Sequence, residues 1–200
     1  MHNGRKDSPF ERSIPLLRQT IRALSGEDGL PTPQSHRVGT IGDVSLRQQV
    51  LCSIDVGSGG VFVPTDTVAQ SDSTNACEAR LRQHLPERFT DIRGALKFAS
   101  LALQGDQPAP RAIVLFTDLE EDVPPHQELA TADLSGLCVV VFFQITGNAP
   151  TKPSDLDRRV QEWRKTFGNW KSKGAIFRHV AAFNATEVSH FIADCARRSS

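Results

Sequence analysis

Two uninterrupted apolar segments, AIVLFT at residues 112–117 and LCVVVFF at residues 137–143, decide the fold class of this chain. Apolar runs that lack alternating polar residues are typical of central parallel strands, because such strands are covered by helices on both faces. Two of them close together in the sequence predict a parallel sheet at the centre of an α/β domain.

The segments around these strands repeat apolar residues with the period of a helix. Such helices are expected at residues 9–25, 92–103 and 156–170. A further strand at 175–180 precedes a last helix, whose first turn is capped by residues 184–187. This order of elements predicts right-handed crossovers in a three-layer, doubly wound, Rossmann-like sheet that is mostly parallel. Trp163, Phe167 and Trp170 share one helix face, which we interpret as core packing.

The region before residue 90 has weaker patterns. Residues 26–46 are rich in turn-forming residues and predict a long connection, with a short extended piece at 38–41. Apolar runs at 49–54 and 61–64 are separated by glycines and predict a hairpin, and Pro64 places its second strand at a sheet edge as the one antiparallel strand. The polar stretch 71–75 is expected to lead into the next helix.

Composition indicates one α/β domain over residues 1–200. The 23 basic and 23 acidic side chains cancel, which argues against a nucleic-acid partner. No apolar run is long enough to span a membrane. The four cysteines have neither zinc-ligand spacing nor a Cys-x-x-Cys pair, so we interpret them as reduced, mostly buried thiols and take the cytoplasm as the default compartment.

Ligands of open α/β sheets bind at the carboxyl ends of the strands, so the residues directly after residue 117 are the first candidates for a site. Asp118 opens the run DLEED at 118–122, which holds four carboxylates in five positions. Thr90 stands at the start of the preceding helix. A hydroxyl and a carboxylate are suitable ligands for Mg²⁺, so Thr90 and Asp118 are the candidate metal residues.

The segments FTDIRGAL at 89–96 and AIVLFTDLEED at 112–122 resemble the second and third metal-site motifs of the von Willebrand factor type A domain family. The resemblance implies that Thr90 supplies a loop hydroxyl and that Asp118 supplies a carboxylate, bound to Mg²⁺ directly or through water. It also implies a non-enzymatic protein–protein interaction module, in which an acidic side chain of the partner completes the metal site.

The first motif of that family, Asp-x-Ser-x-Ser after a central first strand, has no counterpart here, because residues 1–8 are polar and too few to form the strand. The expectation is therefore a domain that is incomplete at its N-terminus, with weak or no metal affinity. Without the first strand, the strands at 49–55 and 112–117 either pair directly or leave backbone groups unpaired. Two aspartates could replace the one in the missing motif, Asp55 and Asp7. We interpret Asp55 as part of a hairpin turn and Asp7 as part of a helix cap.

The candidate metal ligands also have purely structural interpretations. Thr90 also suits a helix N-cap, and Asp118 suits a carboxylate that caps the next turn. The run 120–122 is then a solvated acidic turn, and the bases between 158 and 173 form a solvated helix face. The functional alternative is a Mg²⁺-dependent hydrolase or phosphoryl-transfer enzyme that uses the carboxylates at 118–122. The sequence contains no nucleophile elbow or phosphate-binding loop, so we expect no enzyme.

Overall fold

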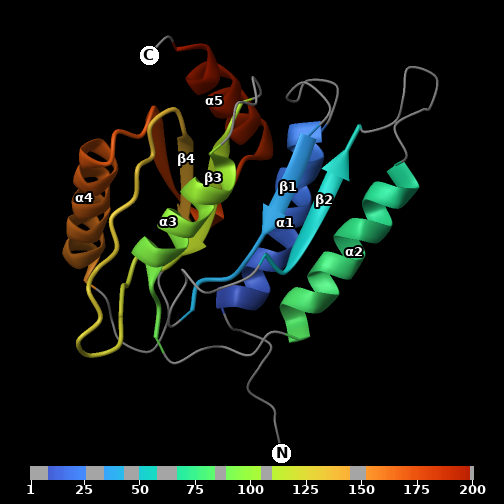
Figure 1. Ribbon diagram of the computed structural model, residues 1–200. Helices are drawn as coiled ribbons and strands as arrows, with labels where there is room; N and C mark the ends of the chain where they lie inside the picture. The colour runs from blue at the N-terminus through green and yellow to red at the C-terminus, as the bar shows by residue number, and fades with distance from the viewer. Residues whose placement is uncertain are drawn as a thin grey trace, which may run out of the picture.

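The computed structural model of the chain describes residues 9–25, 34–42, 50–57, 67–83, 89–104, 110–144 and 152–198 (Figure 1). Its elements follow one another in the order α1 (Pro9–Ser25), β1 (Gln34–Val38), β2 (Cys52–Val56), α2 (Thr67–Gln83), α3 (Ile92–Leu103), β3 (Ala112–Thr117), β4 (Cys138–Phe143), α4 (Pro153–Asn169), β5 (Gly174–His179), the short 3-10 helix η2 (Val180–Ala182) and α5 (Ala185–Arg197). None of the helices in these ranges is both long and apolar enough to cross a membrane.

The strands β3, β4 and β5 form a parallel sheet in that order, which confirms the parallel sheet predicted from the two apolar runs. Helices α3 and α4 pack on one face, where Leu96 and Phe167 join a cluster with alternate residues of the strands. Helix α5 packs on the other face through Val188 and Ile192. The strand β4 is therefore covered on both sides, and its side chains from Cys138 to Phe142 are at most 1% exposed.

The strands β1 and β2 form a separate antiparallel sheet of two strands, so the predicted antiparallel strand does not extend the parallel sheet. The partner of β2 is β1, which lies in the segment expected to be a connection, and the expected partner 61–64 lies outside the described residues. Strand β1 reads QSHRV and contains one apolar residue. Because pairing with β2 rather than an apolar pattern defines this strand, hydrophobic periodicity missed it.

The helices expected at 9–25, 92–103 and around 156–170 are confirmed as α1, α3 and α4. Asn184 caps α5 as predicted, since its side chain accepts hydrogen bonds from the backbone N–H groups of Thr186 and Glu187. The polar stretch 71–75 is not a lead-in but lies inside α2. Serine, threonine and asparagine are weak helix formers, and α2 buries only one narrow stripe that includes Cys77 and Leu81, so the stretch remains helical through packing.

The cysteines are buried, as predicted, but they are not free thiols. Cys52 in β2 is bonded to Cys77 in α2, and Cys138 in β4 is bonded to Cys195 in α5, with Cα atoms 5.5 Å and 6.1 Å apart. Each disulfide joins a strand to the helix that covers it. Spacing along the sequence could not reveal these pairs, because the partners are 25 and 57 residues apart and meet only in the folded chain.

The side chain of His36 in β1 makes stability dependent on pH. Its Nε2 atom is buried and has no hydrogen-bond partner among the described residues. Burial lowers the pKa of His36 below its ordinary value of 6.5, and the nearby charge of Asp55 opposes this only in part. The unfolded chain therefore takes up a proton at a higher pH than the folded chain does.

We accordingly expect full stability above the ordinary histidine pKa, and a loss of stability as the pH falls from there through the lowered pKa of the folded state. Urea unfolding midpoints at about pH 7.5 and about pH 5 measure this loss, since they bracket the ordinary pKa of histidine. A His36→Leu variant should have a smaller difference between the two midpoints. An equal difference in both proteins would assign the pH dependence to other groups.

Candidate functional site

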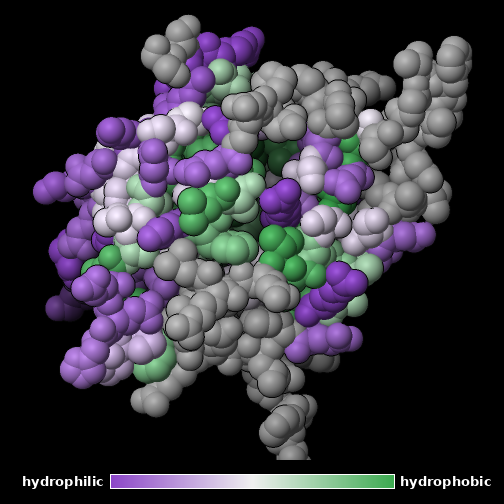
Figure 2. Space-filling view, viewed as in Figure 1, coloured by the Kyte–Doolittle hydropathy of each residue, from purple (hydrophilic) through white to green (hydrophobic). Residues whose placement is uncertain are grey.

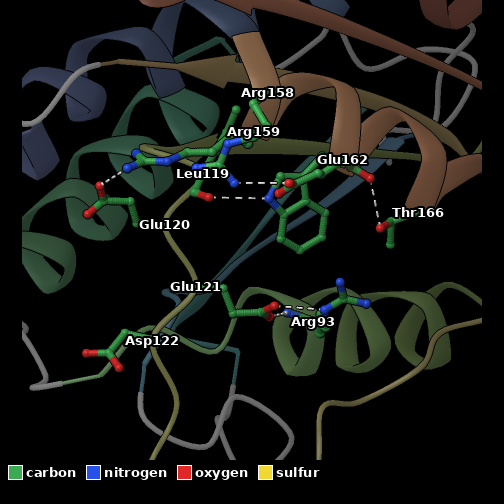
Figure 3. Close-up of a pocket in the computed structure, with 10 residues that line it drawn as sticks. Arg93, Leu119, Glu120, Glu121, Asp122, Arg158, Arg159, Glu162 and Thr166 are labelled. Carbon is green, nitrogen blue, oxygen red and sulfur yellow. Dashed lines mark hydrogen bonds and ion pairs between the residues drawn. The ribbon is translucent and has the colours of Figure 1, made fainter. Parts of the chain in front are cut away.

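A groove of about 530 Å³ opens beside the carboxyl end of β3, between the chain that follows this strand and helix α4 (Figure 3). This is the edge of a parallel sheet at which ligands bind in open α/β folds. Its lining is charged at the rim and has an apolar floor that includes Leu119 and Trp163. The lining residues are Arg93, Leu119, Glu120, Glu121, Asp122, Arg158, Arg159, Glu162, Trp163 and Thr166.

The turn after β3 is held in one conformation by local hydrogen bonds. The hydroxyl of Thr117 accepts from the backbone N–H of Leu119, and the carboxylate of Asp118 accepts from the backbone N–H of Glu120. Leu119 is buried and has a φ of 63°, which is rare for a residue with a branched side chain. Its carbonyl accepts a hydrogen bond from the indole of Trp163 at 3.3 Å, so α4 helps to hold this backbone in place.

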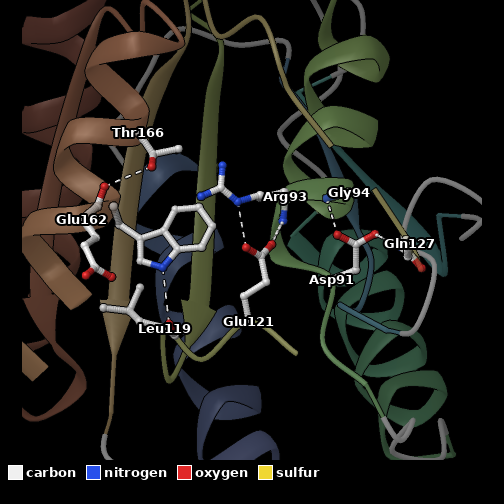
Figure 4. A network of polar contacts seen from close by, with 9 residues as sticks. Asp91, Arg93, Gly94, Leu119, Glu121, Gln127, Glu162 and Thr166 are labelled. Atoms are coloured by element: carbon white, nitrogen blue, oxygen red, sulfur yellow. Dashed lines mark hydrogen bonds and ion pairs between the residues drawn. The ribbon is translucent and has the colours of Figure 1, made fainter. Parts of the chain in front are cut away.

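Arg93 and Glu121 form a charged pair that is joined by two hydrogen bonds at the groove (Figure 4). The carboxylate accepts from the side-chain Nε of Arg93 and from its backbone N–H, both at 2.8 Å. The guanidinium also lies over the rings of Trp163 and Trp170, 5.2 Å and 5.4 Å from their centroids. Because the Glu121 side chain is only 14% exposed, the interpretation of this residue as part of a solvated turn is wrong.

The opposite side of the groove is formed by α4. Arg159 reaches across to Glu120 at 2.5 Å, and Arg158 pairs with Glu162 within the helix at 3.1 Å. In Figure 3 Arg158 and Arg159 lie close to each other, whereas the exposed Asp122 points away from them. The prediction of a solvated basic face holds for Arg158, but Arg159 is only 23% exposed and joins the two sides of the groove.

The N-cap of α3 is Asp91 and not Thr90, so the N-cap interpretation of Thr90 is wrong. The Asp91 carboxylate is 1% exposed, accepts from the backbone N–H of Gly94 at 2.7 Å, and accepts from the side-chain amide of Gln127 at 3.0 Å. Thr90 instead pairs its backbone with that of Asp122 through two hydrogen bonds. This small bridge attaches the acidic run to the start of α3.

The described residues around Thr90 and Asp118 do not supply a cluster of further ligands for Mg²⁺. A magnesium ion requires octahedral coordination by about six oxygens. Asp118 takes the alternative role predicted for it, since it caps the turn at Glu120, and the buried carboxylate of Asp91 is already hydrogen-bonded to Gly94 and Gln127. Among the described residues no group of three or more His, Cys, Asp or Glu side chains could hold a metal. Thr90 and Asp118 thus have no further protein ligands of this kind to complete a site.

Sequence reasoning found the acidic run and the tryptophan stripe but not the pairs that connect them. Trp163, Phe167 and Trp170 are buried, which confirms the core interpretation. Their second role, stacking on Arg93 and donating to Leu119, depends on how α4 lies against the turn after β3. The segment Asp91-Ile-Arg-Gly94 contained the one available signal for the Asp91 N-cap. A glycine three residues after the N-cap Asp has no Cβ atom, so it leaves room for the carboxylate.

Comparison of this chain with protein-family models, with curated proteins and with solved structures found no match in any of the three, so its site is interpreted from its own chemistry.

Proposed function

We propose that this chain is a non-enzymatic protein–protein interaction module, similar in its doubly wound, Rossmann-like organisation to von Willebrand factor type A domains. The partner binds the groove beside the carboxyl end of β3, and it binds without a metal ion. The observation that carries the proposal is the groove itself, in which Arg93, Arg159 and Trp163 are held in place by contacts across its two sides. Arginine and tryptophan are enriched among the residues that dominate binding at protein interfaces.

The chemistry of the lining favours binding over catalysis. The groove contains arginines, carboxylates and one threonine, and it has no cysteine, serine, histidine or lysine in its lining. The Thr166 hydroxyl donates to the carbonyl of Glu162, so no side chain of the groove activates it as a nucleophile. A hydrolase or phosphoryl-transfer enzyme would need such a nucleophile, or a metal site that Asp118 and its neighbours do not form.

The charged side chains on the two sides of the groove determine which partner surface is complementary to it. The side of the groove after β3 carries Glu120 and Asp122, whereas the α4 side carries Arg158 and Arg159 together with Glu162, which pairs with Arg158. A partner with basic groups facing the first side and acidic groups facing the second is complementary to this pattern. Exposed charges at an interface rim chiefly govern association rate and specificity.

The test begins with a photo-crosslinking amino acid at Asp122, which is exposed at the groove, and the same group at Ser73, which is exposed on α2. We expect a defined protein to be captured from the source cells through position 122 and not through position 73. Its affinity for the purified chain is then measured by calorimetry. Equal capture at the two positions, or none at position 122, would contradict the proposal.

The affinity should decrease by about tenfold or more in Arg159→Glu, because the reversed charge repels the acidic groups of the partner. The matched control is Arg197→Glu on α5, where the arginine is 76% exposed and pairs with Asp194. The Arg197 pair is exposed and contributes at most about 1 kcal/mol to stability, whereas Arg159 is 23% exposed, so the unfolding midpoints of both variants are measured alongside their affinities. An equal effect of the two variants would place the interface elsewhere.

Whether partner binding depends on a metal ion is tested by repeating the calorimetric titration in the presence of Mg²⁺. We expect unchanged affinity with or without the ion, in the wild type and in Asp118→Ala. An affinity that requires Mg²⁺ and is lost in Asp118→Ala would restore the metal-dependent scheme. Turnover of a generic phosphoester that is lost in Asp118→Asn would support the enzymatic alternative.

A further inference from the structure

The two sheets lie next to each other, and no hydrogen-bonded ladder joins them among the described residues. Figure 1 shows β1 on the side of β3 that faces away from β4. We call the boundary between β1 and β3 the seam. The strand β3 does not pair with β1 or β2, so the strands at 52–56 and 112–117 do not pair directly.

The hydrogen bonds of β3 show which backbone groups face the seam. The carbonyls of Arg111 and Thr117 accept from the backbone N–H groups of Cys138 and Gln144 in and after β4. In a parallel ladder, alternate residues direct both their N–H and their C=O to the same neighbour. Residues 113 and 115 therefore point toward β4, and the backbone groups of Ala112, Val114 and Phe116 point into the seam.

Side chains of β3 on the α5 face are less buried than those of β4. Ala112, Val114 and Phe116 are half-buried and pack at the margin of the cluster under α5. Their partners in β4, which face the same helix, are at most 1% exposed. Figure 2 shows a hollow beside α3, on the side of β1, whose recessed atoms are coloured as hydrophobic.

The sheets are nevertheless held at fixed positions on either side of the seam. Helix α1 crosses both, because Ile14 and Ile21 pack against β2 and α2 while Leu24 packs against β4 and α5. On the other face, Arg37 of β1 donates to the carbonyl of Ala102 at 3.1 Å. The strands on either side of the seam are thus each anchored to other elements of the fold.

We propose that the seam accepts an extended, predominantly apolar strand of a partner polypeptide, which pairs with the outer edge of β3 and joins the two sheets. Backbone N–H and C=O groups at a strand edge are satisfied by another strand, and strand addition of this kind is an established mode of peptide recognition. The strand is apolar on both faces, because its neighbours are Val114 and Phe116 on one face and Ile113 and Leu115 on the other. This proposal concerns a different surface from the charged groove and does not depend on it.

The experiment measures amide hydrogen exchange by NMR in the chain alone and in a fusion. The fusion carries an alternating Val and Ile strand as long as β3, six residues, joined ahead of Met1 by a flexible Gly/Ser linker that keeps its local concentration high. In the chain alone, the amides of Ala112, Val114 and Phe116 should exchange faster than those of Ile113, Leu115 and Thr117. In the fusion, the first three should slow by about a hundredfold or more, since they become hydrogen-bonded.

The matched control replaces alternate residues of the fused strand with proline, which removes the donors that pair with β3 while the linker stays unchanged. This control should leave the exchange of residues 112, 114 and 116 as it is in the chain alone. Slow exchange of all six amides in the chain alone would show that the edge is already paired, and it would overturn the proposal. Unchanged exchange in the Val and Ile fusion would also overturn it.

Discussion

Loss of the Cys138–Cys195 disulfide is expected to lower the free energy of unfolding by about 4 kcal/mol. The bond closes a loop between residues 57 apart, and a long crosslinked loop strongly restricts the unfolded chain. It also joins the start of β4 to the end of α5, both of which are buried at this point. Guanidinium unfolding of a Cys138→Ala, Cys195→Ala double variant, compared with the wild type without reductant, measures the loss.

The single variants distinguish the crosslink from simple packing. Cys138→Ala and Cys195→Ala should each lose most of the stability lost by the double variant, because either change breaks the bond. Losses that instead add up to the double-variant value would show that the two cysteines act as separate packed side chains. The Cys52–Cys77 bond, which spans 25 residues, should contribute somewhat less, about 3.5 kcal/mol.

Gly94→Ala is expected to destabilise the protein by about 3 kcal/mol, although alanine is the better helix former. A Cβ atom at position 94 would lie 2.0 Å from Oδ2 and 2.6 Å from Cγ of Asp91, so the carboxylate would have to leave its position. The N-cap of α3 and the hydrogen bond from Gln127 would then be lost, and a carboxylate that is 1% exposed would lack its partners. Chemical unfolding measures this difference.

Gly168→Ala in α4 is the matched control. This glycine also lies in a helix, but a Cβ atom there would have no neighbour within 4 Å. Here the helix propensity of alanine should prevail, with a gain of up to about 1 kcal/mol. A similar destabilisation by both substitutions would contradict the role assigned to the contact between Asp91 and Gly94.

The parallel half of the fold could be predicted because its signals are local. The runs at 112–117 and 137–143 are apolar throughout, and the flanking helices carry clear apolar stripes with a period of 3.6 residues. Each pattern reflects the surface that an element buries, so it is visible in a short window. Strand β1 has no such pattern, because it is polar and exists through its register with β2.

The sequence predicted where the candidate site lies but not the contacts that form it. The sequence placed an acidic run directly after β3, where open α/β sheets bind ligands, and it predicted Mg²⁺ ligands at Thr90 and Asp118 from their residue types and from a family resemblance. In the folded chain Thr90 forms a backbone bridge, Asp118 caps a turn, and Glu121 binds Arg93. The Thr90–Asp122 and Arg93–Glu121 pairs join residues about 30 positions apart, so no local pattern encodes them, whereas the Asp118 cap is local and was among the predicted alternatives.

By itself, the sequence determined that this protein is an α/β chain with a parallel sheet, helices that cover this sheet, and an acidic turn at the carboxyl end of β3. Only the tertiary structure decided the cysteine pairing, the separation of the two sheets and the ion pairs of Glu120 and Glu121. The physical reason is the range of the interactions. Burial and helix propensity act on each segment through its own composition, whereas disulfides, strand pairing and ion pairs depend on which segments the packed core brings together.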